Sequence, residues 1–222
     1  MLRTIALTWG FLSCLAVARA QETKVPLKTE VPEEILAGTP PDVLALLFPE
    51  LEKLVEGDPP EFLVPKGTTN LARGKKVIAS SDPVLGELTF VTDGKKQGTE
   101  TNYLELEPDT QWIQIDLEKQ AEIYAFYIWH YFREARSYRD VIIQISDDAK
   151  FKKGVQTIYS NDQDDSSGQG IGKSRPYIET FRGRLFDAKG VKGRYVRIYS
   201  CGNTLNDFNH YVEVEVFGKS AS

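Results

Sequence analysis

Apolar and polar residues alternate with a period of two over most of the chain beyond residue 70, which is the spacing of half-buried β-strands. Residues 123–130 are apolar at nearly every position and predict a central strand that is covered on both faces. The pattern as a whole predicts strands over residues 75–80, 112–117, 123–130, 140–146, 155–159, 176–181, 183–186, 194–199 and 211–217. A series of short strands without a strong helix is typical of an antiparallel β-sandwich.

Residues 21–69 differ in composition from the rest of the chain, because eight of the eleven prolines lie there. Inside this segment, residues 41–56 carry apolar side chains at helical spacing, and Pro49 divides them into two short predicted helices. We interpret residues 21–69 as a proline-rich linker with short helices. The helices either dock on the β-sandwich or offer their apolar surface to a protein partner.

Residues 1–20 have the three parts of a secretory signal peptide. Arg3 supplies the positive end, residues 5–17 supply the apolar core, and Ala18-Arg19-Ala20 is a small-x-small cleavage site. The apolar run is shorter than the roughly 20 residues that a membrane helix needs, and no later stretch approaches that length. We therefore expect a protein that is secreted, periplasmic or held at the cell surface, with no membrane span.

Removal of residues 1–20 would leave 25 basic and 32 acidic residues, a net charge of −7, because that segment contains two arginines and no acid. This balance argues against nucleic acid or an anionic membrane as a partner bound through bulk electrostatics. One cysteine, Cys201, would remain, so no intrachain disulfide is expected. Neither a Gly-x-Ser-x-Gly nor a His-Glu-x-x-His motif occurs in the sequence, and we expect no catalytic activity.

Six short motifs follow one another along residues 70–218 in an order that is similar to one known family. They are Asn70-Leu71-Ala72 with Gly74-Lys75 and Ala79-Ser80, Val91-Thr92-Asp93-Gly94, Trp112-Ile113-Gln114-Ile115-Asp116-Leu117, Ser146-Asp147-Asp148, Arg194-Tyr195-Val196-Arg197-Ile198, and Glu213-Val214-Glu215-Val216-Phe217-Gly218. The ordered set resembles the discoidin family, that is, the coagulation factor five/eight type C domains, within the galactose-binding jelly-roll group. More narrowly, the chain resembles secreted discoidin-domain proteins of planctomycete-type bacteria.

The resemblance implies an all-β fold, an antiparallel jelly-roll β-sandwich over residues 70–219, with ligand recognition by loops at one end and no catalysis. It makes a secreted carbohydrate-binding, lectin-like module that binds an extracellular glycan or polysaccharide the expected function. The alternative is an extracellular protein-interaction or adhesion module that acts through the same loops or through residues 41–56.

A structural calcium ion is also implied by the resemblance. Calcium binds six to eight oxygen atoms, which backbone carbonyls and carboxylates supply together. The expected ligands are Phe90, Asp93, Lys95, Thr99, Val212 and Glu213. Thr99 lies one residue further from Asp93 than is usual in the family, and Thr101 is its substitute. The alternative interpretation makes Asp93-Gly94 a turn and Glu213 an outward strand residue.

The predicted ligand face lies in two loops that contain the only two histidines of the chain. Sugar hydroxyls are bound by planar donors such as guanidinium and imidazole groups, and the apolar face of a sugar ring stacks on an aromatic side chain. If the topology of the family holds, both loops lie at one end of the sandwich. The candidates are His130, Arg133, Arg136, Asn206, Asn209 and His210. The alternative interpretation pairs the arginines with acidic neighbours and makes His210 a loop cap.

Residues 161–172 form a polar loop with several aspartates and glycines. The loop is similar to the start of a calcium-binding loop but lacks the mid-loop glycine, the closing glutamate and the flanking helices of an EF-hand. We interpret it as a solvated loop, with a second, weaker cation site as the alternative.

Overall fold

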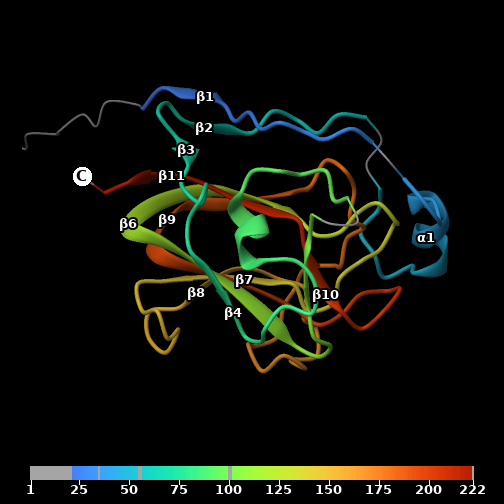
Figure 1. Ribbon diagram of the computed structural model, residues 1–222. Coiled ribbons are helices and arrows are strands. Elements are labelled where there is room, and N and C mark those ends of the chain that lie inside the picture. Colours follow the sequence, from blue (N-terminus) through green and yellow to red (C-terminus); the bar gives the residue numbers. More distant parts are fainter. Residues whose placement is uncertain (1–21, 35, 55–56, 100–101, 222) are drawn as a thin grey trace, which may run out of the picture.

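The computed structural model describes residues 22–221 except for a few positions, and Figure 1 traces the chain. Within this range, residues 35, 55, 56, 100 and 101 are not described. The predicted signal peptide and Thr101, the substitute calcium ligand, therefore lie outside the described residues. Among the described residues, no helix is long and apolar enough to cross a membrane.

One hydrogen-bonded antiparallel sheet forms most of the β domain. Its strands follow the order β3-β11-β6-β9-β7-β8, and β4 also pairs with β6. These strands are β3 (Thr69–Asn70), β4 (Val77–Ala79), β6 (Gln111–Trp129), β7 (Ile142–Ser146), β8 (Gln156–Ser160), β9 (Arg184–Ser200) and β11 (Glu213–Ser220). A separate pair joins β5 (Leu104–Leu106) to β10 (Asn209–Tyr211), and the 3-10 helix η1 spans Leu88–Thr92.

The large sheet folds over into two layers at a bend in its longest strands. The register between β6 and β9 shifts between Asp116 and Ala121, and Glu118 inside this bend has a φ of 69°. Before the bend β6 pairs with β4, and after it β6 pairs with β11. Figure 1 shows the result, in which a layer with β3 and β11 lies above a layer with β4, β7 and β8. This arrangement confirms the predicted antiparallel jelly-roll β-sandwich.

The core lies between the two layers and follows the predicted alternation of apolar side chains. Burial of one such side chain contributes roughly 1.5–3 kcal/mol. Fully buried apolar residues of this core come from β6, β9 and β11, and they include Ile113, Ile115, Val196, Ile198, Val214 and Val216.

Some of the predicted strands differ from those in the structure. Residues 112–117 and 123–129 belong to the single strand β6, and the apolar pattern misses β5, which has only three residues. The prediction of a strand at residues 176–181 is wrong. This segment uses its backbone groups outside a sheet, because Pro176 O accepts a hydrogen bond from Glu52 N (2.7 Å) and Glu179 N donates one to Arg136 O (2.8 Å).

The N-terminal segment contains a two-stranded sheet of β1 (Lys24–Pro26) and β2 (Leu63–Pro65), and the helix α1 (Pro41–Leu47). Of the two helices predicted within residues 41–56, only α1 forms among the residues that the structure describes. Phe48 leaves the helical conformation, with a φ of −125°. The physical reason is Pro49, because the ring of a proline disfavours the α conformation in the residue before it.

The N-terminal segment packs against the β domain. Leu44 of α1 and Leu51 are buried in one apolar cluster with Ala135 and Ile178 of the domain. The segment is therefore held on the sandwich by burial of apolar side chains.

Candidate functional site

Two loops of the β domain lie side by side at one end of the sandwich. Residues 130–141 connect β6 to β7, and residues 201–208 connect β9 to β10. The backbone joins the loops, since Thr204 N donates a hydrogen bond to Ser137 O (3.0 Å). The structure thus brings together two regions of the chain that both carry predicted ligand residues.

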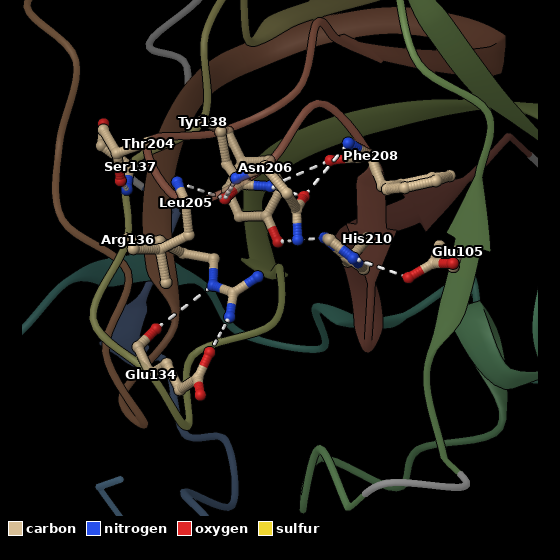
Figure 2. Close-up of polar contacts among 11 residues, drawn as sticks. Glu105, Glu134, Arg136, Ser137, Tyr138, Thr204, Leu205, Asn206, Phe208 and His210 are labelled. Carbon is tan, nitrogen blue, oxygen red and sulfur yellow. Dashed lines mark hydrogen bonds and ion pairs between the residues drawn. The ribbon is translucent and has the colours of Figure 1, made fainter. Parts of the chain in front are cut away.

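Arg136 is fixed in the first of these loops by an acidic neighbour and an aromatic ring. Its Nη2 donates to Glu134 Oε2 (2.7 Å) and its Nε donates to the backbone oxygen of Glu134 (3.3 Å), as Figure 2 shows. Its guanidinium carbon lies 4.7 Å from the centre of the Tyr131 ring. These contacts hold the planar guanidinium group in one orientation. The Arg136 side chain is largely covered, and only 3% of the residue is exposed.

His210 of β10 lies beside this arginine in a chain of polar contacts. Its Nε2 is 2.9 Å from Glu105 Oε2, and its Nδ1 is 2.9 Å from Tyr138 Oη (Figure 2). A carboxylate accepts and a hydroxyl can donate, so in the neutral ring Nε2 carries the proton and Nδ1 accepts. The Tyr103 ring lies edge-on to His210 at 5.6 Å between centroids.

The electrostatics of this group keep His210 uncharged. Burial is the largest cause that lowers the pKa of His210 to about 3, and the nearby Arg136 and His130 lower it further. Burial also raises the pKa of Glu105, an effect that Arg136 partly offsets. At neutral pH the site therefore presents a neutral imidazole next to a cationic guanidinium.

Two other predicted ligand residues are fully buried and support the loops. His130 donates from Nδ1 to Glu179 Oε1 (2.6 Å) and stacks on the Tyr138 ring at 4.5 Å. Asn209 uses all its hydrogen-bonding groups inside the protein, because its Oδ1 accepts from Ser200 and its Nδ2 donates to backbone oxygens. Neither side chain reaches the surface.

The remaining predicted ligand residues occupy different places. Arg133 is half-buried, and Asn206 is exposed at the turn of the second loop, where its Oδ1 accepts from Asn203 Nδ2 (2.7 Å). The Arg136–Glu134 pair is of the kind that the alternative interpretation predicts, in which the arginines pair with acidic neighbours. Glu105 and Tyr138 are polar partners that were not among the predicted ligand residues. Glu105 lies on β5, far along the chain from both loops, and no motif marks it.

Glu213, a predicted calcium ligand, is a fully buried carboxyl group at the start of β11. Its Oε2 accepts a hydrogen bond from Gly94 N (2.9 Å), while its Oε1 is buried without a partner among the described residues. Burial is the main cause that raises the pKa of Glu213 to about 9, and the charges of Glu215 and Asp93 act in the same direction. The environment therefore disfavours the negative charge of Glu213 in the absence of a cation.

The other predicted calcium ligands lie in η1, in the loop after η1 and directly before β11. Asp93 follows η1 and accepts from Lys95 N at its Oδ1 (2.8 Å), so it forms a local turn. Thr99 is exposed, and its backbone oxygen accepts from Asn102 N (3.0 Å). Phe90 belongs to η1, and Val212 lies between β10 and β11, directly before Glu213.

The aspartate-rich loop 161–172 folds back on Asp140, so that carboxylate oxygens of Asp140, Asp162 and Asp164 lie within 4.8 Å of one another. Asp162 is fully buried, and its carboxylate accepts hydrogen bonds from the backbone N–H groups of Ser166 and Ser167. These bonds satisfy the carboxylate within the loop itself. The loop is thus organised by its own polar groups.

The fold and sequence define the class of this protein. Residues 90–198 match the family model of the NedA-like, galactose-binding domain, of the F5/F8 type C group. This match confirms the resemblance to the F5/F8 type C family that the ordered motifs predict. The family model does not extend over the N-terminal segment. A comparison with curated proteins finds no match.

Several solved structures align with this chain. A family 89 glycoside hydrolase from Clostridium perfringens aligns with a TM-score of 0.53 and 21% identity, over 68% of this chain and 15% of the hydrolase. A fucose-binding module from Streptococcus pneumoniae aligns at 0.47 and 22% identity, over 67% of this chain and 96% of the module. A chitosan-binding module from a Paenibacillus species aligns with a TM-score of 0.44 and 22% identity, over 68% of this chain and 99% of the module. The chain thus spans only a small part of the hydrolase.

Proposed function

We propose that this protein is a secreted, non-catalytic carbohydrate-binding module. The observation that carries the proposal is the arrangement of Arg136, His210 and Glu105 beside Tyr131, at a loop end of a galactose-binding-family domain. Planar donors, a carboxylate and an aromatic ring are the groups that bind sugar hydroxyls and a sugar ring face. In this proposal Arg136 donates to a sugar hydroxyl through Nη1, which makes no bond to Glu134, and Glu105 accepts from another hydroxyl.

We expect the variant Arg136→Ala to bind glycans roughly tenfold to a hundredfold more weakly than the unchanged protein, because a charge-assisted hydrogen bond to the sugar is lost. Arg136→Lys should recover little of this loss, since an ammonium group lacks the planar fork. The measurement is a screen of the protein on a glycan and polysaccharide panel, followed by titration calorimetry with the strongest ligand.

The matched control is Arg175→Ala, which removes an exposed arginine and should leave binding unchanged. Melting temperatures of all variants show whether each is folded. A folded protein that binds no glycan would contradict the proposal. It would favour an extracellular protein-interaction module instead, for which the exposed apolar residues Leu46 (82%) and Leu47 (66%) of α1 offer a surface.

We also propose that a structural calcium ion is held by Asp93 and Glu213, with oxygens of Phe90, Lys95, Thr99 and Val212. The residues fit a cation, because Glu213 has a buried oxygen without a partner and Asp93 stands close enough to raise its pKa. A bound calcium ion would neutralise the carboxylates of Asp93 and Glu213 and would link the end of η1 to the start of β11. Its role would be to hold the loop after η1 in place.

Calcium should stabilise the folded protein by about 2.7 kcal/mol at a concentration 100 times its dissociation constant. Glu213→Gln should abolish this stabilisation, because the amide carries no charge to bind the ion. The control Glu118→Gln replaces an exposed glutamate and should keep the full response. Thermal unfolding with calcium and with a chelator measures the effect, and identical curves for the unchanged protein would refute the site.

A further inference from the structure

The N-terminal segment contacts the loop between β6 and β7 at the residues directly before Arg136. Ala37 N donates a hydrogen bond to Arg133 O (2.5 Å), and Ala37 pairs with Glu134 in an isolated parallel β-bridge. The next loop residue, Ala135, is fully buried in the apolar cluster that includes a leucine of α1. Three consecutive residues of this loop therefore lie against the N-terminal segment.

The β domain holds the part of the same loop that begins at Arg136. Arg136 O accepts a hydrogen bond from Glu179 N (2.8 Å), and Ser137 O accepts one from Thr204 N (3.0 Å). Within the described part of the chain, no strand of the β domain forms a hydrogen bond with the backbone of residues 133–135. The N-terminal segment thus supplies the support that the domain does not give to the loop before Arg136.

Glu134 connects this support to the arginine. A Cβ atom built on Gly38 would lie 3.6 Å from Glu134 Cγ, so the stem of the glutamate lies against the backbone of the N-terminal segment. The Glu134 carboxylate accepts a hydrogen bond from Arg136 Nη2 (2.7 Å), as Figure 2 shows. A binding group keeps one orientation when the groups around it are themselves held in place. The orientation of Arg136 therefore depends on the segment that holds Glu134.

The chain on either side of Ala37 is fixed to the domain independently of this contact. Before it, Thr29 Oγ1 accepts a hydrogen bond from Lys96 Nζ (2.6 Å). After it, Glu52 pairs with Arg184 (2.7 Å), and the segment closes a cleft of about 430 Å³ on the domain. Because both ends are anchored, loss of the hydrogen bond at Ala37 should free the loop without releasing the whole segment.

We propose that the N-terminal segment is a positioning element of the loop site, and that Ala37 and Gly38 are its positioning residues. They hold Glu134, and through it Arg136, in the orientation that binds the ligand. The family model covers residues 90–198, so it includes the loop but not the segment that positions it. The inference rests on the proposed function of the loop site, and it adds that the matched domain by itself is not the complete binding unit.

The test is the variant Ala37→Pro, which removes the N–H group that donates to Arg133 O. The Ala37 side chain is exposed, so the proline ring enters no buried space. Titration calorimetry with the strongest ligand of the glycan panel should show binding about tenfold weaker than in the unchanged protein. The matched control is Glu33→Pro, which should keep full affinity. Glu33 is also exposed, and its N–H has no hydrogen-bond partner among the described residues.

A double-mutant cycle separates positioning of Arg136 from a general structural effect. If Ala37 acts through Arg136, the double variant Ala37→Pro/Arg136→Ala binds no more weakly than Arg136→Ala alone. A structural role that is independent of Arg136 would make the two losses add. Additive losses would overturn the inference and leave the proposed function in place. The same holds if Ala37→Pro keeps full affinity while Arg136→Ala does not.

Hydrogen exchange of the ligand-free protein tests the inference without any glycan. Ala37→Pro should speed amide exchange over residues 133–137 by about tenfold or more and leave the core strands β6 and β9 unchanged. Equal exchange of this loop in Ala37→Pro and Glu33→Pro would overturn the inference. A protein that binds no glycan contradicts the proposed function, and the exchange rates then still decide whether the segment holds the loop.

A second variant keeps the inference testable if Ala37→Pro unfolds the protein. Glu134→Ala removes the side chain that connects the segment to Arg136, and Glu134 is only half-buried. This variant should weaken glycan binding by a factor similar to that of Ala37→Pro. Full affinity in a folded Glu134→Ala protein would overturn the inference.

Discussion

Replacing Lys96 by methionine is expected to lower the free energy of unfolding by about 3–5 kcal/mol, because the change leaves a buried carboxylate without its partner. Lys96 Nζ lies 2.8 Å from Glu215 Oε1, and the two side chains are only 6% and 8% exposed. The same ammonium group donates to Thr29 Oγ1 (2.6 Å) and to the backbone oxygen of Glu30 (2.9 Å), and it lies over the Trp129 ring. The lysine therefore also fastens the N-terminal segment to the sandwich.

Urea unfolding measures this effect, and an exposed ion pair supplies the comparison. Lys75→Met removes the partner of Glu118, whose side chain is 66% exposed, and should cost no more than about 1 kcal/mol. The double variant Lys96→Met/Glu215→Met should recover part of the loss, since neither charge then remains buried. A Lys96→Met protein as stable as Lys75→Met would show that the buried pair contributes little.

Acid should destabilise the protein through His210, by up to about 1.4 kcal/mol for each pH unit between about 6.5 and 3. The pKa of His210 is lowered to about 3 in the folded state, first by burial and then by Arg136 and His130. As the pH falls below about 6.5, His210 therefore binds a proton in the unfolded chain but not in the folded protein. The stabilisation is present above pH 6.5 and is lost as the pH falls toward 3.

Glu105 acts on the same stability curve with the opposite sign. Because burial raises the pKa of Glu105, its carboxylate takes up a proton at a higher pH in the folded protein than in the unfolded chain. This difference favours the folded state as the pH falls through the pKa of Glu105 in the folded protein. Urea unfolding at a series of pH values measures the sum. Glu213, whose pKa is raised to about 9, acts in the same direction as Glu105 over this range. Between pH 6.5 and 5, His210→Gln should therefore lose up to about 1.4 kcal/mol less stability for each pH unit than the unchanged protein. The same slope in both proteins would assign the acid sensitivity to other groups.

The alternation of side chains was enough to predict the class of fold. Residues such as Ile113 and Val214 are buried because a strand turns successive side chains to opposite faces, and this period is visible without any tertiary information. The ordered motifs likewise predicted the family. The bend of β6 could not be predicted, because a strand that crosses between layers has the same apolar pattern as two separate strands.

The candidate sites were predictable only where their residues lie in motifs or loops. Arg136, His210 and Glu213 could be singled out, whereas Glu105 and Glu179 could not, because each lies in a segment without a recognisable pattern. The sequence also placed Asn209 on the ligand face, although its amide is buried and fully bonded. Residue type indicates which chemistry a side chain can perform, and its accessibility depends on packing.

The sequence by itself determined the β-sandwich, the two histidine-containing loops and the acidic residue at the start of the last strand. The tertiary structure decided which carboxylates face these groups and how the N-terminal segment closes a cleft on the domain. The physical reason is that strand patterning is local, with a period of two residues. Contacts such as His130–Glu179 join groups far apart in the chain and arise only when the layers pack.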